Sequence, residues 1–195
     1  AGLSCAYFLA QMSYPVTVFD KDPIPGGMLT KGMPSFRLEK DVVYAEIEVL
    51  KEMGVEFRCG VEVGKDVTIP QLREQGYKAF YLAIGLQSAQ TLNIPGEDLD
   101  GVIGGIDFLR SVNSGDTTSV PGDTVVIGGG NAAIDVARTL TRLGDSPVKL
   151  FCLESDEEMP TVPDEKNEAI AEGVLINNCW GPKQILGENG KVTGV

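Results

Sequence analysis

The sequence contains no histidine among its 195 residues. Histidine is the most common general base in enzymes and the most common metal ligand, so both of these sources of chemistry are missing. The four cysteines, Cys5, Cys59, Cys152 and Cys179, form no CxxC pair, which excludes a redox dithiol of that kind and an iron–sulfur cluster. Chemistry must come from a bound cofactor or from carboxylates, lysines and cysteines. We predict no catalytic side chain and no metal site.

Long hydrophobic runs and excess positive charge are also missing. No run is long and apolar enough to cross a bilayer, which argues against a membrane protein. The formal net charge of −12 repels phosphate backbones and argues against nucleic-acid binding. Scattered single cysteines are typical of reduced thiols, so we expect a cytoplasmic protein. Hydrophobic residues make up 43% of the chain, which is enough for a packed core.

The apolar pattern predicts an α/β fold made of two similar units. In each unit a helix of small residues leads to a buried strand that ends at an acidic residue. Two Rossmann-like nucleotide-binding units in tandem are the simplest explanation. The expected helices cover residues 3–10, 39–53 and 132–143, and the expected strands cover residues 16–20, 55–59, 79–84, 124–127 and 148–153.

The second unit holds a GxGxxA turn between a strand and a helix, at residues 128–133. In such a turn Gly128 allows the sharp exit from the strand, and Gly130 lets the backbone approach a pyrophosphate. Ala133 allows the helix to pack closely on the strand. The pyrophosphate then lies at the helix N-terminus, beside Asn131 and Ala132. This pattern predicts binding of a nicotinamide dinucleotide.

An acidic residue follows the next strand of each unit. Glu154 can accept both ribose hydroxyls of NAD and would repel the 2′-phosphate of NADP, so it favours NADH, with NADPH possible. In the first unit Gly2 would be the end of a second glycine turn, and Asp20 would be its ribose-binding acid.

Several segments resemble one known family, the glutamate synthase small (beta) subunit and its relatives. These relatives include one half of dihydropyrimidine dehydrogenase and the large subunit of ferredoxin–NADP transhydrogenase. The resemblance covers the whole chain, and its most specific part is Gly-Met-Pro-Ser-Phe-Arg-Leu at residues 32–38. The other segments are Asp20-Lys21-Asp22, Pro25-Gly26-Gly27-Met28-Leu29, residues 46–57 and Ile94-Pro95-Gly96-Glu97-Asp98.

The resemblance implies an FAD domain with an NAD(P)H domain following or inserted. Hydride would pass from nicotinamide to FAD, and electrons would leave to an iron–sulfur domain or subunit. The implied bounds are residues 1–112 for a partial FAD domain, 113–122 for a linker and 123–195 for the NAD(P)H domain, truncated at both ends. The implied FAD contacts are Gly2, Asp20, Lys21, Gly27, Met28, Leu29, Arg37, Val63, Ala83, Ile84 and Gly85.

Two departures from the family pattern matter. Ile84 stands where relatives have threonine, which removes one polar contact. Leu153-Glu154 stands where relatives often carry two arginines that bind the NADP phosphate, which again favours NADH. Two alternatives stay open. One is a non-catalytic module that senses NADH, and the other is a flavoprotein of the disulfide-reductase type, against which the missing CxxC argues.

Overall fold

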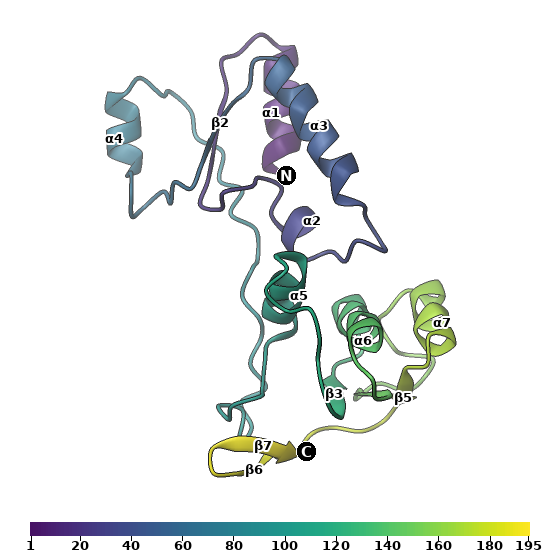
Figure 1. Ribbon diagram of the computed structural model, residues 1–195. Helices are drawn as coiled ribbons and strands as arrows, with labels where there is room; N and C mark the ends of the chain where they lie inside the picture. The colour runs from purple at the N-terminus through teal and green to yellow at the C-terminus, as the bar shows by residue number, and fades with distance from the viewer. The chain divides into compact units, whose positions relative to one another are not determined.

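The structure is a computed structural model that describes residues 1–195, and the chain divides into two compact units, Ala1–Gln87 and Ser88–Val195 (Figure 1). The division lies before helix α5 (Gly105–Asn113), because α5 packs on α6 (Asn131–Leu143) of the second unit. The linker expected at 113–122 therefore lies inside the second compact unit. None of the helices has the length and apolar character needed to span a membrane.

The first unit is built on two parallel strands, β1 (Thr17–Asp20) and β2 (Glu56–Cys59). Helices α1 (Gly2–Gln11) and α3 (Lys40–Glu52) contact each other, and α1 also contacts β1. Their shared core consists of Ala6, Leu50 and Val55, with partly buried apolar residues around it. Two short helices, α2 (Met28–Lys31) and α4 (Ile69–Glu74), complete the unit. The helix and strands expected at 39–53, 16–20 and 55–59 are confirmed to within two residues.

The strand expected at residues 79–84 is wrong. The segment makes no strand pairing, and Leu82 and Ile84 are 76% and 82% exposed. The sheet of this unit consists of β1 and β2 alone, and the backbone at 79–84 pairs with neither of them. An apolar sequence alone does not form a strand.

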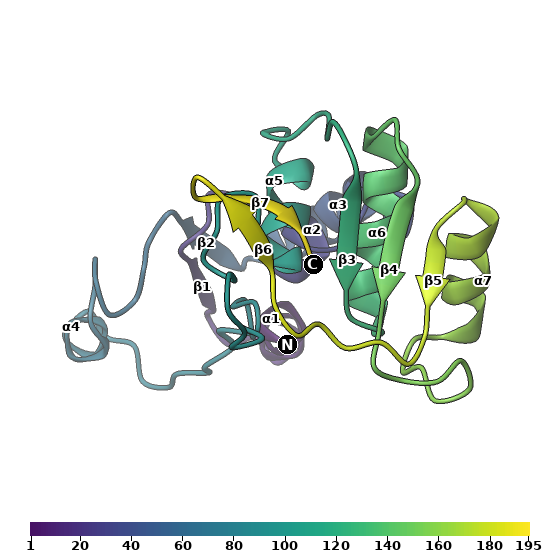
Figure 2. The same ribbon diagram turned by 90° about the horizontal axis from the view of Figure 1, so that it is seen from below.

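The second unit contains a parallel three-stranded sheet in the order β3 (Thr124–Ile127), β4 (Val148–Phe151) and β5 (Leu175–Asn177). Helix α6 connects β3 to β4, and α7 (Pro163–Ala171) lies between β4 and β5 in the chain. Both helices lie on one face of the sheet (Figures 1 and 2). Ile134 of α6 and Leu150 of β4 are fully buried between the layers. Strands β6 (Leu186–Glu188) and β7 (Lys191–Gly194) form a separate antiparallel hairpin.

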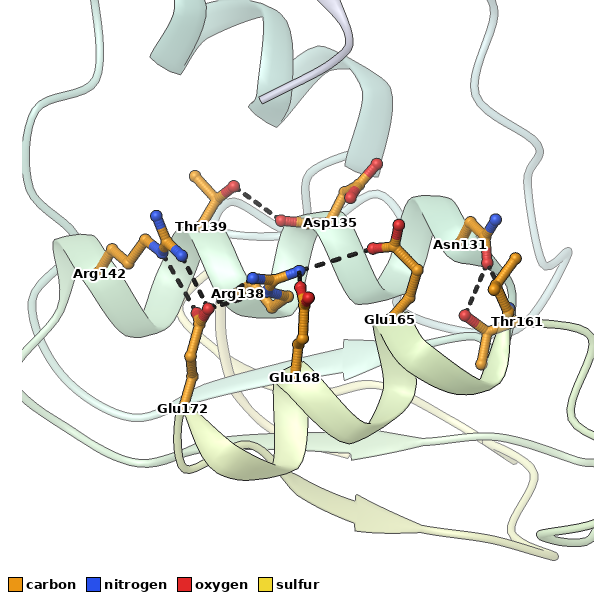
Figure 3. A network of polar contacts seen from close by, with 10 residues as sticks. Asn131, Asp135, Arg138, Thr139, Arg142, Thr161, Glu165, Glu168 and Glu172 are labelled. Carbon is orange, nitrogen blue, oxygen red and sulfur yellow. Dashed lines mark hydrogen bonds and ion pairs between the residues drawn. The ribbon is translucent and has the colours of Figure 1, made fainter. Parts of the chain in front are cut away.

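Charged side chains join α6 to α7 (Figure 3). Arg138 is only 5% exposed, and its guanidinium lies 2.6 Å from Glu168 and 2.6 Å from Glu172. Arg142 also binds Glu172, at 2.7 Å. The hydrogen bond from Arg142, followed by that from Arg138, lowers the pKa of Glu172 to about 2 even though burial opposes the shift. Three carboxylates face one buried arginine here, since Glu165 lies 3.5 Å from Arg138.

Candidate functional site

The glycine turn of the second unit begins with a backbone that requires glycine. Gly128 has a φ of 135°, a conformation that other residues rarely adopt, and its N–H donates to the carbonyl of Phe151 at 2.9 Å. A Cβ on Gly128 would lie 3.4 Å from the Cβ of Ala133, so α6 crosses closely over the end of β3. The backbone conformation of Gly128 and the close packing of Ala133 therefore agree with what the sequence predicts for such a turn.

Gly130 differs because neither its backbone nor its packing requires glycine. Its φ is −87°, and an added Cβ would meet no protein atom within 4 Å. Helix α6 begins directly after it, with no side-chain cap and no acidic residue in the first turn. Open space thus lies beside a helix N-terminus, where backbone N–H groups and the helix dipole favour an anion. A dinucleotide pyrophosphate fits this combination.

Glu154 reaches back from the end of β4 to the glycine turn. A Cβ on Gly129 would lie 2.8 Å from Glu154 Oε2 and 3.0 Å from the Cβ of Cys152. The backbone carbonyl of Glu154 is held by the N–H of Cys179, at 3.0 Å. The structure therefore brings the expected ribose-binding carboxylate to the turn and fixes its backbone.

Asn131 makes contacts that sequence reasoning missed. Its side-chain oxygen accepts hydrogen bonds from the hydroxyl of Thr161 at 2.6 Å and from the N–H of Val162 at 2.9 Å (Figure 3). These bonds fix the segment before α7 to the first residue of α6. Nothing in the local sequence signals Thr161, because the two residues meet only through the fold. Ala132, the next residue of α6, is exposed beside this contact.

In the first unit, two of the expected FAD residues meet although they are far apart in the sequence. A Cβ on Gly2 would lie 3.2 Å from the Cβ of Ala83, so the start of α1 and the segment around residue 83 are adjacent. Ile84 and Gly85 follow in an exposed stretch without regular secondary structure, where Gly85 has a φ of 69°. The close approach at Gly2 leaves no room for a larger residue without a shift of Ala83.

The acidic end of β1 is tied to two loops. The carbonyl of Asp20 accepts from the N–H of Val61 at 3.0 Å, which brings the loop carrying Val63 to this strand end. The carboxylate of Asp20 accepts from the N–H of Asp22, also at 3.0 Å. Lys21, between them, is exposed. The loop that carries Val63 therefore lies beside Asp20 at the end of β1.

The Gly27-Met28-Leu29 segment is fastened by two lysines that sequence reasoning missed. Lys31 lies 2.5 Å from the carboxylate of Asp22, next to the end of β1. Lys40 donates to the carbonyl of Leu29 at 2.9 Å and to that of Met33, and burial lowers the pKa of its ammonium group. Gly27 begins α2 with a φ of 57°. Arg37 is partly buried, and its N–H donates to the carbonyl of Pro34 at 3.0 Å.

Comparisons with known proteins agree with this geometry. Three curated relatives match almost the whole chain. They are the NADP(+)-dependent formate dehydrogenase subunit beta of Moorella thermoacetica (41% identical, 100% of this chain, 28% of the relative), the glutamate synthase [NADPH] small chain of Halomonas elongata (39%, 100% and 43%) and the NAD-dependent dihydropyrimidine dehydrogenase subunit PreT of Salmonella typhimurium (36%, 99% and 46%). The chain therefore spans less than half the length of these relatives.

A solved structure and a family model extend the comparison. FprA from Mycobacterium tuberculosis superposes with a TM-score of 0.77 at 21% identity, over 98% of this chain and 59% of FprA, and this likeness confirms the α/β fold class. The relatives confirm the recognised resemblance to the glutamate synthase small subunit. The model of the pyridine nucleotide-disulphide oxidoreductases matches residues 1–179. The chain belongs to the pyridine nucleotide-disulphide oxidoreductase family.

Proposed function

We propose that this chain carries the nucleotide sites of an NAD(P)H-dependent flavoprotein oxidoreductase similar to the glutamate synthase small subunit. The observation that carries the proposal is Gly130, a glycine that the chain's own conformation and packing do not need, placed at the N-terminus of α6. When bound, FAD accepts a hydride from the nicotinamide and releases electrons one at a time. The side chains bind and orient the two nucleotides, and none acts as an acid or base.

The second unit binds the nicotinamide dinucleotide in this proposal. Gly128 turns the chain out of β3, Gly130 leaves room for the pyrophosphate, and Ala133 keeps α6 close to the sheet. Backbone N–H groups of Asn131 and Ala132 face the pyrophosphate at the helix N-terminus. The side chain of Asn131 holds the Thr161 segment in place and so acts as a positioning residue.

NADH is the proposed donor because Glu154 lies beside the turn. A carboxylate there accepts the two ribose hydroxyls of NADH and repels the 2′-phosphate of NADPH. The relatives carry both specificities in their names, since two are named for NADP or NADPH and PreT is named for NAD. In this proposal the residue at this strand end decides between the two donors.

FAD binds the first unit in this proposal. Gly2 lies at the N-terminus of α1, where backbone N–H groups favour the FAD pyrophosphate, and Asp20 at the end of β1 holds the adenosine ribose. The remaining contacts come from the loops fastened around this strand end and from the segment after Ala83. They are Lys21, Gly27, Met28, Leu29, Arg37, Val63, Ile84 and Gly85.

The electron acceptor in this proposal is an iron–sulfur domain or subunit. The relatives are named as subunits or as a small chain, which supports a partner subunit, and its iron–sulfur nature is what the family resemblance implies. The chain itself offers no group of histidine, cysteine and acidic residues arranged to hold a metal ion. The alternative, a module that only senses NADH, predicts a colourless protein, whereas a flavoprotein absorbs in the visible range.

The experiment compares the purified protein with a Gly130→Val variant. Since an added Cβ meets no protein atom within 4 Å, the variant should keep its thermal unfolding midpoint and circular dichroism spectrum. Its dissociation constant for NADH should rise at least about tenfold, or about 1.4 kcal/mol. The matched control is Ala171→Val, an exposed position at the end of α7 and outside the glycine turn. An unchanged NADH affinity in the folded Gly130→Val variant would remove the turn from the site.

A further inference from the structure

Two cysteines far apart in the sequence meet next to the glycine turn. Cys152 directly follows β4, and Cys179 comes two residues after β5. The thiol of Cys152 lies 3.7 Å from the carbonyl oxygen of Glu154, and the thiol of Cys179 lies 4.0 Å from the same oxygen. Since both sulfur atoms approach a single atom, they share one small region of the structure. Both cysteines are free thiols in this structure.

The backbone holds the two cysteines in this arrangement. Cys152 donates its N–H to the carbonyl of Asn177 at 3.1 Å and accepts the N–H of Trp180 at 2.9 Å. Cys179 donates its N–H to the carbonyl of Glu154 at 3.0 Å. These bonds hold the segments 152–154 and 177–180 side by side. The two segments cannot separate without losing these hydrogen bonds.

The conformation of Cys179 explains why its thiol lies near the same carbonyl oxygen as the thiol of Cys152. In a regular strand, neighbouring side chains point to opposite faces. Asn178 already faces Cys152, because its side-chain amide donates to the Cys152 sulfur at 3.3 Å. Cys179 has a φ of 61°, which is uncommon for a residue other than glycine, and this left-handed conformation ends the alternation. Its thiol therefore approaches the same Glu154 carbonyl as its neighbour's amide.

The surroundings give the two thiols different reactivities. Cys179 is exposed, whereas Cys152 is buried and its pKa is raised by burial and then by the charge of Glu154. A reagent from solution reaches Cys179 first, because oxidation of cysteine depends on access and on thiolate character. Cys152 then stands next to it as the thiol that can complete a disulfide.

We propose that Cys152 and Cys179 form a reversible disulfide when hydrogen peroxide oxidises the protein. The Cys179 thiol loses its proton and attacks one peroxide oxygen, the O–O bond breaks, and a sulfenic acid forms while the leaving hydroxide takes up that proton as the first water. The Cys152 thiol loses its proton and attacks the Cys179 sulfur, so that the S–S bond forms and the S–O bond breaks, releasing a second water. The two sulfur atoms lose two electrons in total, and the peroxide gains them.

This modification site lies directly beside the dinucleotide turn. An added Cβ on Gly129 would lie 3.0 Å from the Cβ of Cys152, and Glu154 is only two residues further along the chain. Formation of the disulfide therefore modifies the Cys152 side chain, which lies close to Gly129. This link to dinucleotide binding rests on the proposed function, whereas the disulfide itself rests only on the geometry of the two cysteines.

The test treats the purified, reduced protein with hydrogen peroxide, quenches the reaction with catalase, alkylates the remaining thiols under denaturing conditions, and maps the peptides by mass spectrometry. Wild type should lose two of its four thiols and yield one linked peptide pair containing Cys152 and Cys179. Dithiothreitol should restore both thiols. The Cys179→Ser variant should yield no linked pair, and the control Cys59→Ser in the first unit should yield the same linked pair as wild type.

Two results would overturn the proposal. One is a peroxide-treated wild type in which all four thiols remain free. The other is Cys179 carried on to sulfinic or sulfonic acid with no link to Cys152. The thiol analysis uses no nucleotide, so a protein that forms the disulfide but binds no NADH supports this inference and contradicts the proposed function.

Discussion

Glu154 shows how one residue can set the choice of nucleotide. Its carboxylate approaches Gly129 closely enough that even a methyl group on that glycine would contact it, at 2.8 Å. Its backbone is fixed by hydrogen bonds from Cys179 and Asn178. A carboxylate held at this place meets the adenosine ribose of a dinucleotide bound on the turn. The charge of Glu154, more than its size, is then expected to exclude a 2′-phosphate.

Replacing Glu154 by glutamine tests this expectation, because the side chain keeps its shape and loses its charge. The ratio of NADPH affinity to NADH affinity should rise about tenfold, or about 1.4 kcal/mol. Fluorescence titration with both nucleotides measures the ratio. Glu157→Gln, an exposed change in the same loop, serves as the control and should leave the ratio unchanged. A ratio that is the same in Glu154→Gln and wild type would exclude Glu154 from the ribose site.

Glu172 makes stability depend on pH. Its pKa is lowered from 4.5 to about 2 in the folded chain, first by the hydrogen bond from Arg142. A carboxyl group with a lowered pKa stabilises the fold at any pH above its unfolded value and loses this contribution as the pH falls through the folded value. The contribution of Glu172 should therefore be complete near neutral pH and decline between pH 4.5 and about 2.

Denaturant unfolding of wild type and Glu172→Gln across this range measures the effect. The difference in unfolding free energy between them should be constant above about pH 5 and should shrink steadily below pH 4.5. Glu157→Gln is again the control, because Glu157 is exposed. A difference that does not change with pH would show that the Glu172 carboxylate is not stabilised by its arginine partners.

Single residues were predictable from the sequence where their role is local. Gly128, Gly130 and Ala133 depend on the backbone of one short turn, and the structure gives each a geometry that suits its expected role. Thr161 and Lys40 were missed because their contacts join segments that are distant in the sequence. A motif records which residues follow one another, and it contains nothing about which loops meet after folding.

At the level of elements, charge fixes α7 to α6. Arg138 is buried and lies against carboxylates from three successive turns of the α7 region, Glu165, Glu168 and Glu172 (Figure 3). Arg142 binds the last of these, and its side chain is 44% exposed. Removal of one member of a buried ionic group is costly because the partners left behind keep their charge without compensation. The two arginines therefore form a natural comparison.

Arg138→Met should lower the free energy of unfolding by about 2 kcal/mol, since it removes a buried guanidinium that lies against the partly buried Glu165 and Glu172. Arg142→Met should cost less than about 1 kcal/mol, as is usual for exposed ion pairs. Chemical denaturation of both variants under identical conditions gives the two values. Equal losses in the two variants would contradict the role assigned to Arg138, because exposure would then have no influence on the strength of the contact.

The elements themselves were predicted unevenly, for physical reasons. Helix α3 was found because Val43, Ile47 and Leu50 recur at helical spacing and become buried. Helix α4 was missed, although Thr68 and Gln71 form a capping box that marks its start. The segment at 79–84 was apolar enough for a strand, but strand formation depends on a neighbour, and β1 pairs only with β2. Helices can be read from local spacing, whereas strands require knowledge of their partners.

At the level of the whole molecule, the two compact units carry different parts of the expected chemistry. All residues assigned to FAD lie in Ala1–Gln87, and the glycine turn with Glu154 lies in Ser88–Val195. Each unit has its own parallel strands and its own hydrophobic core. A ligand that binds one unit raises the free energy of local opening in that unit. The increase is about 2.7 kcal/mol when the ligand concentration is a hundred times the dissociation constant. The two nucleotides should therefore protect different parts of the chain.

Hydrogen–deuterium exchange measured by mass spectrometry tests this division. NADH should slow exchange in β3, the glycine turn, the first turns of α6 and the end of β4, and should leave peptides from Ala1–Gln87 unchanged. FAD should give the reverse pattern, with protection at the start of α1, the end of β1 and the loop around Gly27. The Gly130→Val variant is the control, because it should lose the NADH pattern and keep the FAD pattern. NADH protection confined to the first unit would contradict the proposed assignment of the two sites, because the glycine turn would then not be where the nicotinamide nucleotide binds.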